Sequence, residues 1–473
     1  AFMRKTKIIC TLGPACSKEA TLRALLRGGM DAARFNFSHG THASHLAQLN
    51  ALRSACRQEH RIVATILDTK GPEIRIGTFE NGPIALSAGD SFTLTTKEVP
   101  GSSKQVSVNY ADLPRDLHPG DRILIDDGLI ELRAESITGS DILCTVLAGG
   151  PLSNNKSINV PDVNISLPGL TSRDRSDIKF AVEQDFDYIA VSFVRTAADI
   201  LAVRELLKSL GNSDIRLIAK IENREGVHHL DEIIAVSDGV MVARGDLGVE
   251  IPMEEIPFLQ KEMIRKGVLS GKPVIVATQM LDSMIRNPRP TRAEVSDIAN
   301  AVFDYASCVM LSGETASGKY PVEALETMVR TVEEAESHID YQKRFREENF
   351  SIDGSVTNAI SHASCAAAFD LKANVIITVT HAGVTARMIS RFKPSCPICA
   401  ATVSEKVCRQ LRLSWGVYPT MTQPAANTDE LFAAAADACK RAGYVKDGNL
   451  AVITAGIPVG RSGTTNLIKI EVL

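Results

Sequence analysis

Short apolar segments rich in β-branched residues recur along the chain and alternate with segments of helical period. In residues 198–210 and 257–269, apolar positions repeat every three to four residues, which predicts amphipathic helices. Near-continuous apolar strands separated by helices are typical of a parallel sheet covered on both faces. Eight such strands predict an α/β fold with a closed (β/α)8 TIM barrel, its strands in residues 7–13, 31–37, 61–68, 187–193, 216–222, 239–245, 273–279 and 308–314.

A long insertion interrupts this alternation between Asp68 and Asp187. The dipeptide Asp127-Gly128 within it is a strong hairpin signal. Apolar and polar residues alternate with period two, as in antiparallel strands, in residues 73–79, 91–96, 105–109 and 121–135. Because the insertion follows the third strand at the end of a barrel where active sites lie, we expect an inserted β-barrel domain that acts as a lid.

The last part of the chain reads as a separate α/β domain. Charge-rich residues 333–350 lead into it. Strands are expected in residues 375–380, 397–402, 417–421, 450–456 and 468–473, and helices in residues 385–392 and 430–443. The expected boundaries are therefore 1–69 and 171–340 for the barrel, 70–170 for the lid and 341–473 for the C-terminal domain.

Composition narrows the class of protein. A chain of 473 residues is too long for one compact core and predicts two to four domains. The net charge of −4 does not favour a nucleic-acid-binding protein, which would carry an excess of basic residues. No apolar run is long enough to span a membrane. The apolar run 8–12 is too short for a signal peptide, and ten cysteines without framework spacing fit a reducing compartment, so we expect a cytoplasmic protein.

Polar residues gather late in the apolar runs, which is the C-terminal face of the predicted barrel. Lys220 and Glu222 lie two positions apart, so their side chains share one face of a strand. Asp246 follows the next strand in a glycine-containing turn. Two acids beside a lysine suit a hard, oxygen-bound cation such as Mg²⁺ next to a phosphate or an enolate. A plain strand-end ion pair, with Asp246 as a helix cap, is the structural alternative.

Ordered motifs along essentially the whole chain resemble those of the pyruvate kinase family. They are CTLGPA, RFNFSHGTH, LDTKGPEIR, DDGLIEL, AKIENREG, MVARGDLGVEIP, ATQMLDSMIRNPRPTRAEVSDIANAVFD, MLSGETASGKYP and SGTTN. The resemblance implies transfer of a phosphoryl group from phosphoenolpyruvate to ADP, giving pyruvate and ATP in the last step of glycolysis. It also implies a homotetramer that is regulated by a phosphorylated effector.

The resemblance assigns roles to the residues of the predicted site. Glu222 and Asp246 match the ligands of Mg²⁺ (or Mn²⁺), and Lys220 matches the lysine that neutralises the moving phosphoryl group and the enolate. Arg34 matches a phosphate-binding arginine. Backbone amides at Gly245 and Asp246 would receive the substrate carboxylate.

A potassium site and a proton relay are also implied. Asn36, Ser38, Asp68 and Thr69 match the K⁺ ligands, although Asn36 and Ser38 also suit a turn. Glu73 indicates K⁺ dependence, because relatives that work without K⁺ tend to carry lysine there. Proton delivery to the enolate is assigned to Thr278, Ser312 and Glu314, and Thr278 is also assigned to substrate binding. A water relay backed by Glu314 is the expected route.

Nucleotide and effector sites complete the implied set. The nucleotide positions are Asn36, His39, Arg75 and Lys156, and Ser44 stands where many relatives have tyrosine. Two loops match the effector site, through Thr380, His381, Gly383, Thr385, Ser462, Gly463 and Thr464. Ala382 lacks a hydroxyl and Val384 lacks a positive charge, so a sugar or nucleotide monophosphate is at least as suitable as fructose 1,6-bisphosphate. A purely structural role for these loops is the alternative.

Three other motifs are interpreted as structural. Residues 313–320 nearly spell a P-loop, but Tyr320 replaces the Ser or Thr that would bind Mg²⁺. His39, His42 and His45 diverge on a helix and cannot share one ion. Cys396 and Cys399 lie in an apolar strand and are expected to be buried thiols. A Mg²⁺-dependent lyase or aldolase and a catalytically silent sugar-phosphate sensor are the competing functions.

Overall fold

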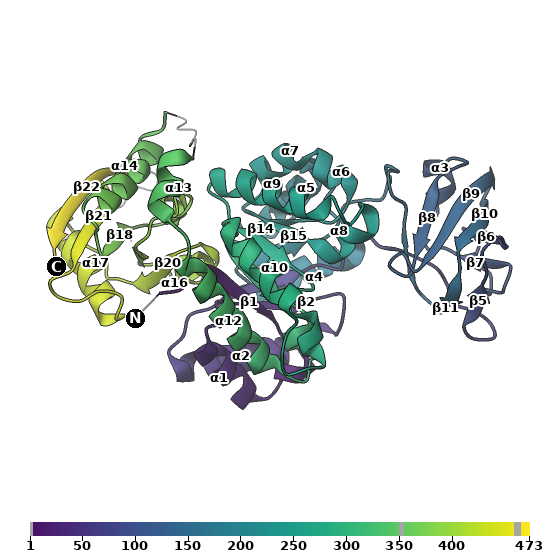
Figure 1. Ribbon diagram of the computed structural model, residues 1–473, viewed down its shortest axis with the longest axis horizontal. Coiled ribbons are helices and arrows are strands. Elements are labelled where there is room, and N and C mark those ends of the chain that lie inside the picture. Colours follow the sequence, from purple (N-terminus) through teal and green to yellow (C-terminus); the bar gives the residue numbers. More distant parts are fainter. Residues whose placement is uncertain (1–2, 349, 351–353, 458–464) are drawn as a thin grey trace.

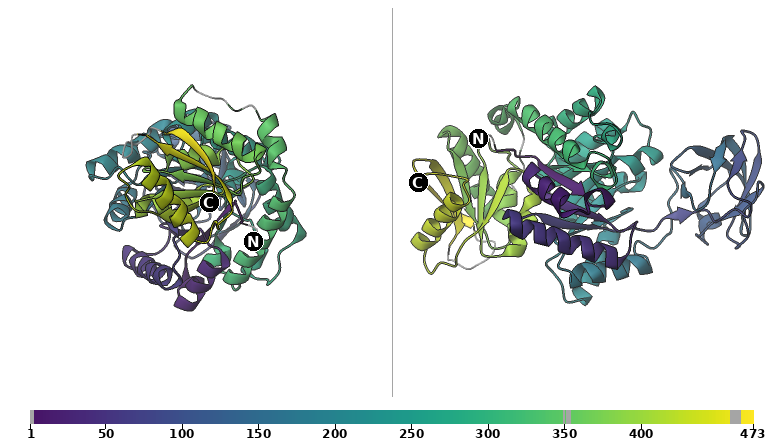
Figure 2. Two further views of the ribbon diagram at one scale, coloured as in Figure 1. Left: turned by 90° about the vertical axis from the view of Figure 1, so that its left-hand side faces the viewer. Right: turned by 90° about the horizontal axis from the view of Figure 1, so that it is seen from below.

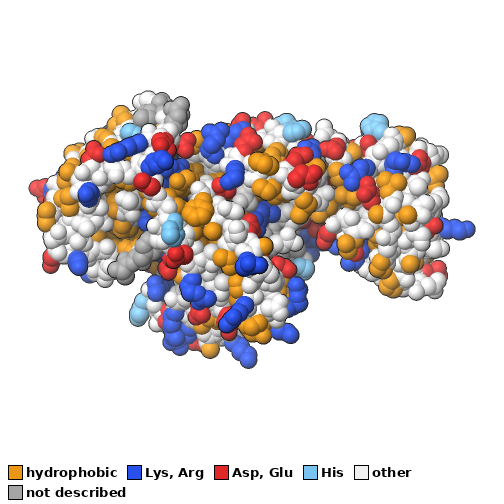
Figure 3. Space-filling model, in the orientation of Figure 1, with side chains coloured by type: hydrophobic (Ala, Val, Ile, Leu, Met, Phe, Trp, Pro, Cys, Tyr) orange, Lys and Arg blue, Asp and Glu red, His pale blue; other side chains and the backbone are white. Residues whose placement is uncertain are grey.

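Three units lie in a row along the molecule, with the barrel in the middle (Figure 1). The computed structural model describes residues 3–348, 350, 354–457 and 465–473. The lid lies at one end of the barrel and the C-terminal domain at the other, and a second view shows the same order (Figure 2). No helix in these ranges is long and apolar enough to cross a membrane. Acidic and basic side chains are intermixed on the face shown in Figure 3.

The predicted (β/α)8 barrel is confirmed. Its parallel strands close in the order β1-β17-β16-β15-β14-β13-β3-β2. The strands are short and almost wholly buried, because each packs on side chains inside the barrel and on helices outside it. They are β1 (Lys7–Thr11), β2 (Ala32–Asn36), β3 (Ala64–Asp68), β13 (Tyr188–Val191), β14 (Arg216–Ile221), β15 (Gly239–Ala243), β16 (Val274–Ala277) and β17 (Cys308–Leu311).

Helices cover the outside of the barrel, and capping boxes at Thr41, Thr171 and Thr291 fix where three of them begin. The longer ones are α1 (Glu19–Gly28), α2 (His42–Glu59), α4 (Ser172–Glu183), α5 (Ala197–Ser209), α7 (Leu230–Val236), α9 (Ile256–Leu269), α10 (Arg292–Phe303) and α12 (Pro321–Ser337). Short ones lie in the connections: η1 (Pro14–Cys16), α6 (Arg224–His228), α8 (Arg244–Glu250), η2 (Asp282–Ile285) and α11 (Gly313–Ala316).

The lid has its own apolar core and a seven-stranded sheet in the order β4-β12-β8-β9-β10-β6-β7. An antiparallel bridge between Ile76 and Val108 joins the two edges of this sheet. Asp126, Asp127 and Gly128 adopt positive φ in the predicted hairpin between β8 and β9. The elements are β4 (Ile74–Arg75), β5 (Ile84–Leu86), β6 (Ser91–Thr95), β7 (Gln105–Ser107), α3 (Leu113–Asp116), β8 (Arg122–Ile125), β9 (Ile130–Thr138), β10 (Asp141–Ala148), β11 (Gly150–Leu152) and β12 (Ser157–Asn159).

Two details of the lid differ from the prediction. Strands β6 and β7 pair in parallel rather than antiparallel fashion, because the chain between them crosses over instead of turning back. Strand β10 was not predicted, although residues 141–148 alternate between buried and exposed positions where the strand lies between β9 and β6. Local period two therefore identifies strands here but not their partners.

The C-terminal domain is a five-stranded sheet in the order β20-β19-β18-β21-β22, with antiparallel β22 at one edge. Apolar clusters lie on both faces of the sheet. All five predicted strands are present. The elements are α13 (Tyr341–Glu347), α14 (Val356–Asp370), β18 (Val375–Val379), α15 (Val384–Ser390), β19 (Ile398–Thr402), α16 (Glu405–Gln410), η3 (Leu411–Leu413), β20 (Val417–Met421), α17 (Thr428–Arg441), β21 (Leu450–Gly456) and β22 (Thr465–Val472).

A disulfide in this domain corrects one sequence prediction. Cys399 of β19 is bonded to Cys439 of α17, so it is not a free thiol; Cys396 is a free, buried thiol as expected. The partners are 40 positions apart and meet only because α17 packs on the sheet. The expectation that the cysteines are free thiols is therefore wrong for Cys399 and Cys439.

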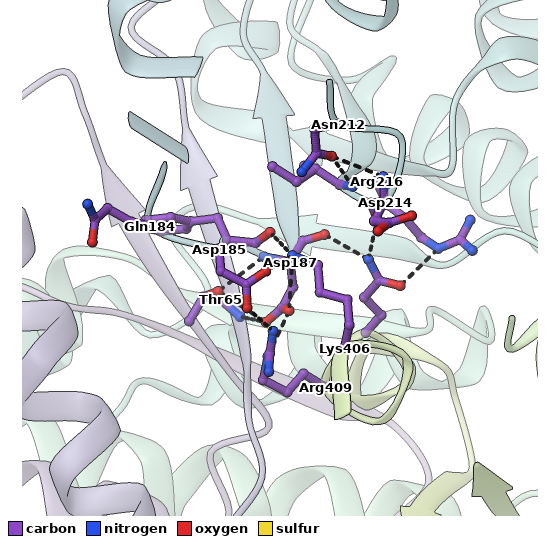
Figure 4. Close-up of polar contacts among 12 residues, drawn as sticks. Thr65, Gln184, Asp185, Asp187, Asn212, Asp214, Arg216, Lys406 and Arg409 are labelled. Carbon is purple, nitrogen blue, oxygen red and sulfur yellow. Dashed lines mark hydrogen bonds and ion pairs between the residues drawn. The ribbon is translucent and has the colours of Figure 1, made fainter. Parts of the chain in front are cut away.

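Charged side chains join the C-terminal domain to the N-terminal end of the barrel (Figure 4). Asp187, at the start of β13, is fully buried; its carboxylate accepts hydrogen bonds from Thr65 and from Arg409 of α16. Arg409 also pairs with Asp185 at 2.6 Å. At the start of the neighbouring strand β14, Arg216 donates to Gln410. These contacts fix the C-terminal domain against the barrel face opposite the lid.

Candidate active site

A buried network of charges occupies the C-terminal end of the barrel. The Lys220 ammonium lies 3.0 Å from an oxygen of Asp68 and 2.9 Å from an oxygen of Glu222. The other oxygen of Asp68 accepts a 2.6 Å hydrogen bond from Arg34, which also donates to Thr11. Strands β2, β3 and β14 thus bring together residues that are distant in the sequence but share one end of the barrel. Four of the predicted site residues form one connected network.

Charge partners set the protonation of this network. Burial alone would lower the pKa of Lys220, but Asp68 and Glu222 outweigh burial and raise it. Burial alone would raise the pKa of Asp68, but Arg34 and Lys220 lower it. Both groups therefore stay charged near neutral pH.

Ser192, which sequence reasoning missed, ties the network together. The Lys220 ammonium donates to its hydroxyl at 2.8 Å, and that hydroxyl lies within hydrogen-bond distance of Asp68 and of the Thr69 carbonyl. The next backbone N–H, that of Phe193, donates to Glu222. The signal was present, because Ser192 is a polar residue late in a predicted strand, as the assigned residues are.

Glu222 and Asp246 are the two acids of the predicted Mg²⁺ site. Asp246 lies in the first turn of α8, and its side chain is open to a cavity that Glu222 also lines. Burial, together with the negative charge of Asp246, raises the pKa of Glu222 to about 7. The described ranges contain no group of three or more His, Cys, Asp or Glu side chains that could hold a metal ion. The donor set therefore fits a cation bound by two carboxylates and completed by substrate oxygens rather than an all-protein cage.

A cavity of about 900 Å³ opens between this network and the lid. Arg34, Lys220, Glu222 and Asp246 line its barrel side. Asn36, His39 and Arg75, which are predicted to bind the nucleotide, also line it. Polar groups from the barrel and the lid that were not predicted join them: Lys70, Thr96, Glu98, Ser107, Asn109 and Asn155. Barrel and lid therefore contribute to one polar chamber.

Lys156 lies apart from Asn36 and His39, which are also predicted to bind the nucleotide. It lines a second cavity of about 560 Å³ and pairs with Asp126 at 2.8 Å. Glu73, Arg75, Phe193 and Asp246 line both cavities. The two spaces thus adjoin at the bases of the lid strands, and Lys156 faces the far one.

The predicted K⁺ ligands lie side by side at the ends of β2 and β3, where Asn36 is in register with Asp68. The Asn36 side-chain oxygen accepts from the Ser38 backbone N–H, so the turn anticipated as an alternative is present. The Thr69 hydroxyl accepts from the Ser192 N–H. Glu73 accepts hydrogen bonds from Arg75. Three of the four predicted ligands thus already accept hydrogen bonds, Asn36 and Thr69 from the backbone and Asp68 from Arg34 and Lys220.

Thr278 contacts the turn at Gly245, which is predicted to bind the substrate carboxylate, rather than Ser312 or Glu314, the other residues of the predicted relay. Its hydroxyl accepts a 2.7 Å hydrogen bond from the Gly245 N–H, which is one of the amides predicted to bind substrate. Thr278 has a φ of 71°, a backbone strain that recurs at functional sites. Arg244, also missed from sequence, holds the Thr278 carbonyl at 2.7 Å and is anchored by Asp297.

Glu314 is buried, and its two oxygens accept from the backbone N–H groups of Leu281 and Ser312. The Ser312 hydroxyl is buried and has no hydrogen-bond partner. No described side-chain hydrogen bond joins Glu314 to Thr278. The acid therefore shapes the loop after β17, while the Ser312 hydroxyl is left unsatisfied.

The first predicted effector loop is closely packed. The Thr380 hydroxyl accepts from the Gly383 N–H, which stabilises the turn at this glycine (φ 79°). Thr385 is buried and shares a hydrogen bond with Thr465, whereas His381 is exposed. Ser462, Gly463 and Thr464 lie outside the described residues. The pairing of Thr385 with Thr465 joins the starts of α15 and β22.

The three motifs that were interpreted as structural show no ligand geometry. Residues 313–316 form α11, and Pro321 begins α12, so no phosphate-binding loop opens a long helix here. His42 bonds to Asp177 at 2.6 Å, whereas His45 bonds to the His39 carbonyl at 2.8 Å. The partners of His42 and His45 therefore differ, and that of His45 is the backbone of His39.

Comparison with known proteins agrees with this geometry. The family model for the pyruvate kinase barrel domain matches residues 3–325, and the model for the pyruvate kinase alpha/beta domain matches residues 358–471. The chain is 47% identical to the pyruvate kinase of Clostridium acetobutylicum over 472 residues, covering all of both proteins. It is 48% identical to that of Geobacillus stearothermophilus, covering 99% of this chain and 80% of the relative.

A solved structure supports the same assignment. The crystal structure of a pyruvate kinase from Cryptosporidium parvum superimposes with a TM-score of 0.94 at 40% identity, covering 99% of this chain and 96% of that one. Similarity thus extends through barrel, lid and C-terminal domain. The chain belongs to the pyruvate kinase family and is a phosphotransferase.

Proposed function

We propose that the chain transfers the phosphoryl group of phosphoenolpyruvate to ADP, giving pyruvate and ATP, with Mg²⁺ (or Mn²⁺) and K⁺ as cofactors. The observation that carries the proposal is the position of the Lys220 ammonium. It is held by Asp68, Glu222 and Ser192 and faces the 900 Å³ chamber beside Asp246. Phosphoryl transfer needs charge neutralisation and positioning more than covalent help from the protein, and this site offers both.

Glu222 and Asp246 would hold the divalent cation. Burial raises the pKa of Glu222 and the negative charge of Asp246 raises it further, and the charge of a dication would offset both effects. When bound, the ion would supply positive charge that stabilises the phosphoryl group during transfer. Substrate oxygens would complete its coordination, because Mg²⁺ commonly uses only one or two protein carboxylates.

Arg34 and Lys220 would neutralise the transferred group. Arg34 donates hydrogen bonds from Nε to Asp68 and from Nη1 to Thr11, and these bonds fix the guanidinium. Its other N–H groups remain for a phosphate. Lys220 is oriented by three oxygens and stays protonated. Its positive charge would stabilise the enolate oxygen that forms as the phosphoryl group leaves.

Asn36, Ser38, Asp68 and Thr69 would bind K⁺ at the rim of the chamber. Their contiguity at the ends of β2 and β3 supports this role. Thr278 would set the carboxylate-binding turn through Gly245 and belongs to the proton-delivery group with Ser312 and Glu314. Asn36, His39, Arg75 and Lys156 would bind the nucleotide. Since Lys156 lies on the far cavity, a movement of the lid is needed to bring it to the others.

Regulation is assigned to the C-terminal domain. A phosphorylated sugar or nucleotide monophosphate would bind at the loop of Thr380, His381, Gly383 and Thr385. The structure offers a route for its effect, because the Ala382 carbonyl accepts hydrogen bonds from Arg216 and Arg387. Arg216 begins β14, the strand that carries Lys220. We further propose a cytoplasmic homotetramer.

The test is formation of pyruvate and ATP from phosphoenolpyruvate and ADP, measured with and without Mg²⁺ and with K⁺ or a large organic cation. Glu222→Gln and Asp246→Asn should each abolish most activity, whereas Glu183→Gln, which changes an exposed side chain of α4, should leave it unchanged. A lyase or aldolase would form no ATP, and a silent sensor would form neither product. Either result would overturn the proposal.

A further inference from the structure

The first two turns of α4 contact both loops that carry the predicted K⁺ ligands. Asn36 ends β2 and Ser38 lies in the loop that follows, while Asp68 ends β3 and Thr69 continues toward the lid. Helix α4 is the first helix after the lid and packs on the outside of the barrel. Its residues 173, 174 and 177 are not among the described residues that line the catalytic chamber. They therefore reach the two ligand loops from outside the site.

Arg173 holds the loop after β2 at the peptide bond between two predicted ligands. Its Nη2 atom donates a 2.8 Å hydrogen bond to the Phe37 carbonyl. The N–H of the same peptide group, that of Ser38, donates to the Asn36 side-chain oxygen at 3.1 Å. The Phe37 N–H donates to the Asp68 carbonyl at 3.0 Å. Arg173 therefore helps to fix the orientation of the peptide group that lies between Asn36 and Ser38.

Asp174 holds the second ligand loop and is buried. One of its carboxylate oxygens accepts a 3.0 Å hydrogen bond from the Gly71 N–H. The other oxygen accepts from the hydroxyl and the N–H of Thr171, at 2.7 Å and 3.0 Å. Gly71 follows Thr69 by two positions and adopts a φ of 73°, so the chain turns directly after the predicted ligands. Asp174 thus ties the start of α4 to the segment that continues from Thr69.

Asp177 orients Arg173 and joins α4 to α2. Its side chain is only 3% exposed, with Oδ1 2.6 Å from His42 Nε2 and Oδ2 3.8 Å from Arg173 Nε. His42 is the first residue of α2, the helix that follows the loop of Asn36 and Ser38. The buried carboxylate therefore lies between two nitrogens and attracts the guanidinium that reaches the loop.

Prior placement of the oxygens matters more for K⁺ than for Mg²⁺. A monovalent ion attracts each oxygen with half the charge of a divalent ion, so it contributes less energy for moving a loop into place. Ligands that are already held where the ion needs them raise its affinity without any new contact. Two loops from different strands must be held at once here, and α4 contacts both of them.

We propose that Arg173, Asp174 and Asp177 are positioning residues of the K⁺ site, which hold its two ligand loops in place before the ion binds. The inference rests on the proposed K⁺ site and assigns the three residues no contact with the ion, the substrate or the nucleotide. Arg173 is the residue to test, because its side chain is 47% exposed and lines a surface hollow of about 440 Å³. Its removal therefore leaves the barrel core intact.

Thermal unfolding in the absence of substrates measures ion binding apart from activity. The chain is titrated with potassium chloride while tetramethylammonium chloride keeps the ionic strength constant, and the Kd for K⁺ is obtained from the rise of Tm with K⁺ concentration. Loss of one hydrogen bond to the ligand loop in Arg173→Met should raise this Kd about fivefold. Arg173→Lys should recover part of the affinity, because an ammonium can also donate to the Phe37 carbonyl. Arg175→Met, which removes an exposed arginine of the same helix, should keep the wild-type Kd.

Steady-state kinetics gives a second measurement of the same effect. The K⁺ concentration that half-activates pyruvate formation should rise by the same factor in Arg173→Met, whereas kcat at saturating K⁺ should stay within about twofold of wild type. Should the methionine variant not fold, Arg173→Gln gives the same test, because its shorter side chain also withdraws the donor from Phe37.

The outcomes separate this proposal from the K⁺ site itself. A merely structural role would lower Tm by the same amount at every K⁺ concentration and leave the Kd unchanged, which would refute the positioning role while the K⁺ site stands. An equal rise of the Kd in Arg175→Met would refute it as well. If the wild-type chain shows neither K⁺-dependent activity nor a K⁺-dependent Tm, the K⁺ site fails and the positioning role fails with it.

Discussion

Substitution of Lys220 by methionine tests the proposed catalytic role most directly. Methionine keeps much of the side-chain length and apolar bulk but removes the charge that lies between Asp68 and Glu222. Two unit charges about 4 Å apart interact by about 4 kcal/mol at an effective dielectric constant near 20. Loss of that interaction in the transition state corresponds to a decrease in kcat of about 10³-fold.

The variant is expected to fold. Asp68 keeps its 2.6 Å contact with Arg34, and Glu222 can take up a proton because its pKa is raised to about 7. The affinity for phosphoenolpyruvate should decrease by a much smaller factor than kcat does, since Arg34 and the cation ligands remain. A group that acts only in the transition state lowers kcat and kcat/KM together.

The assay is steady-state formation of pyruvate at saturating ADP, Mg²⁺ and K⁺, with Tm measured in parallel. Lys179→Met, an exposed lysine on α4, is the matched control and should retain full activity. Retention of more than about a tenth of kcat in Lys220→Met would refute the reasoning. A loss confined to KM would do so as well, because it would assign Lys220 to ground-state binding.

Three further predictions concern cations and regulation. Activity should collapse when K⁺ is replaced by tetramethylammonium, and Glu73→Lys should restore part of it; equal wild-type rates in the two salts would contradict the K⁺ site. The pKa of Glu222 is about 7, and a carboxylate must lose its proton to bind a metal ion. As the pH is increased, Mn²⁺ affinity should therefore rise about tenfold per pH unit up to pH 7 and stay level at higher pH. Titrations of Glu222→Gln should lose that slope, and persistence of the slope would show that another group titrates. A sugar or nucleotide monophosphate should sharpen the phosphoenolpyruvate saturation curve at a lower effector concentration than fructose 1,6-bisphosphate does. Thr385→Ala should weaken this activation without changing the maximal rate. The reverse order of effectors would refute the argument from Ala382 and Val384.

Local pattern predicted most of the fold, because each barrel strand is buried on both faces and carries its own signal. The eight barrel strands and five C-terminal strands were found from apolar runs alone. The parallel pairing of β6 with β7 was not, because strand period carries no information on strand partners. The disulfide of Cys399 was not predicted either, because its partner Cys439 lies on a helix whose packing against the sheet is not signalled by local pattern.

The site was predictable where residues share one strand and less so where loops or lids place them. Lys220 and Glu222 lie together because the strand period requires it. The hydrogen bond from Gly245 to Thr278 depends on a left-handed backbone that no pattern signals. Lys156 depends on the angle of the lid, which sequence does not fix. Arg244 lay inside a quoted motif, but its function as an anchor emerges only from its five side-chain contacts with α9, α10 and residues 277–280.

The insertion of the lid also determines how the chain can fold. Thr65 and Asp187 bond across neighbouring barrel strands although they are 122 positions apart, and closing a flexible loop of that length costs about 4 kcal/mol. Within the lid, however, the entry strand β4 pairs with the exit strand β12 through Ile74 and Ile158. A lid that folds first therefore brings its own ends together and leaves only short linkers to close. The insertion behaves as a module that evolution can exchange or lengthen while the order of the barrel strands stays the same.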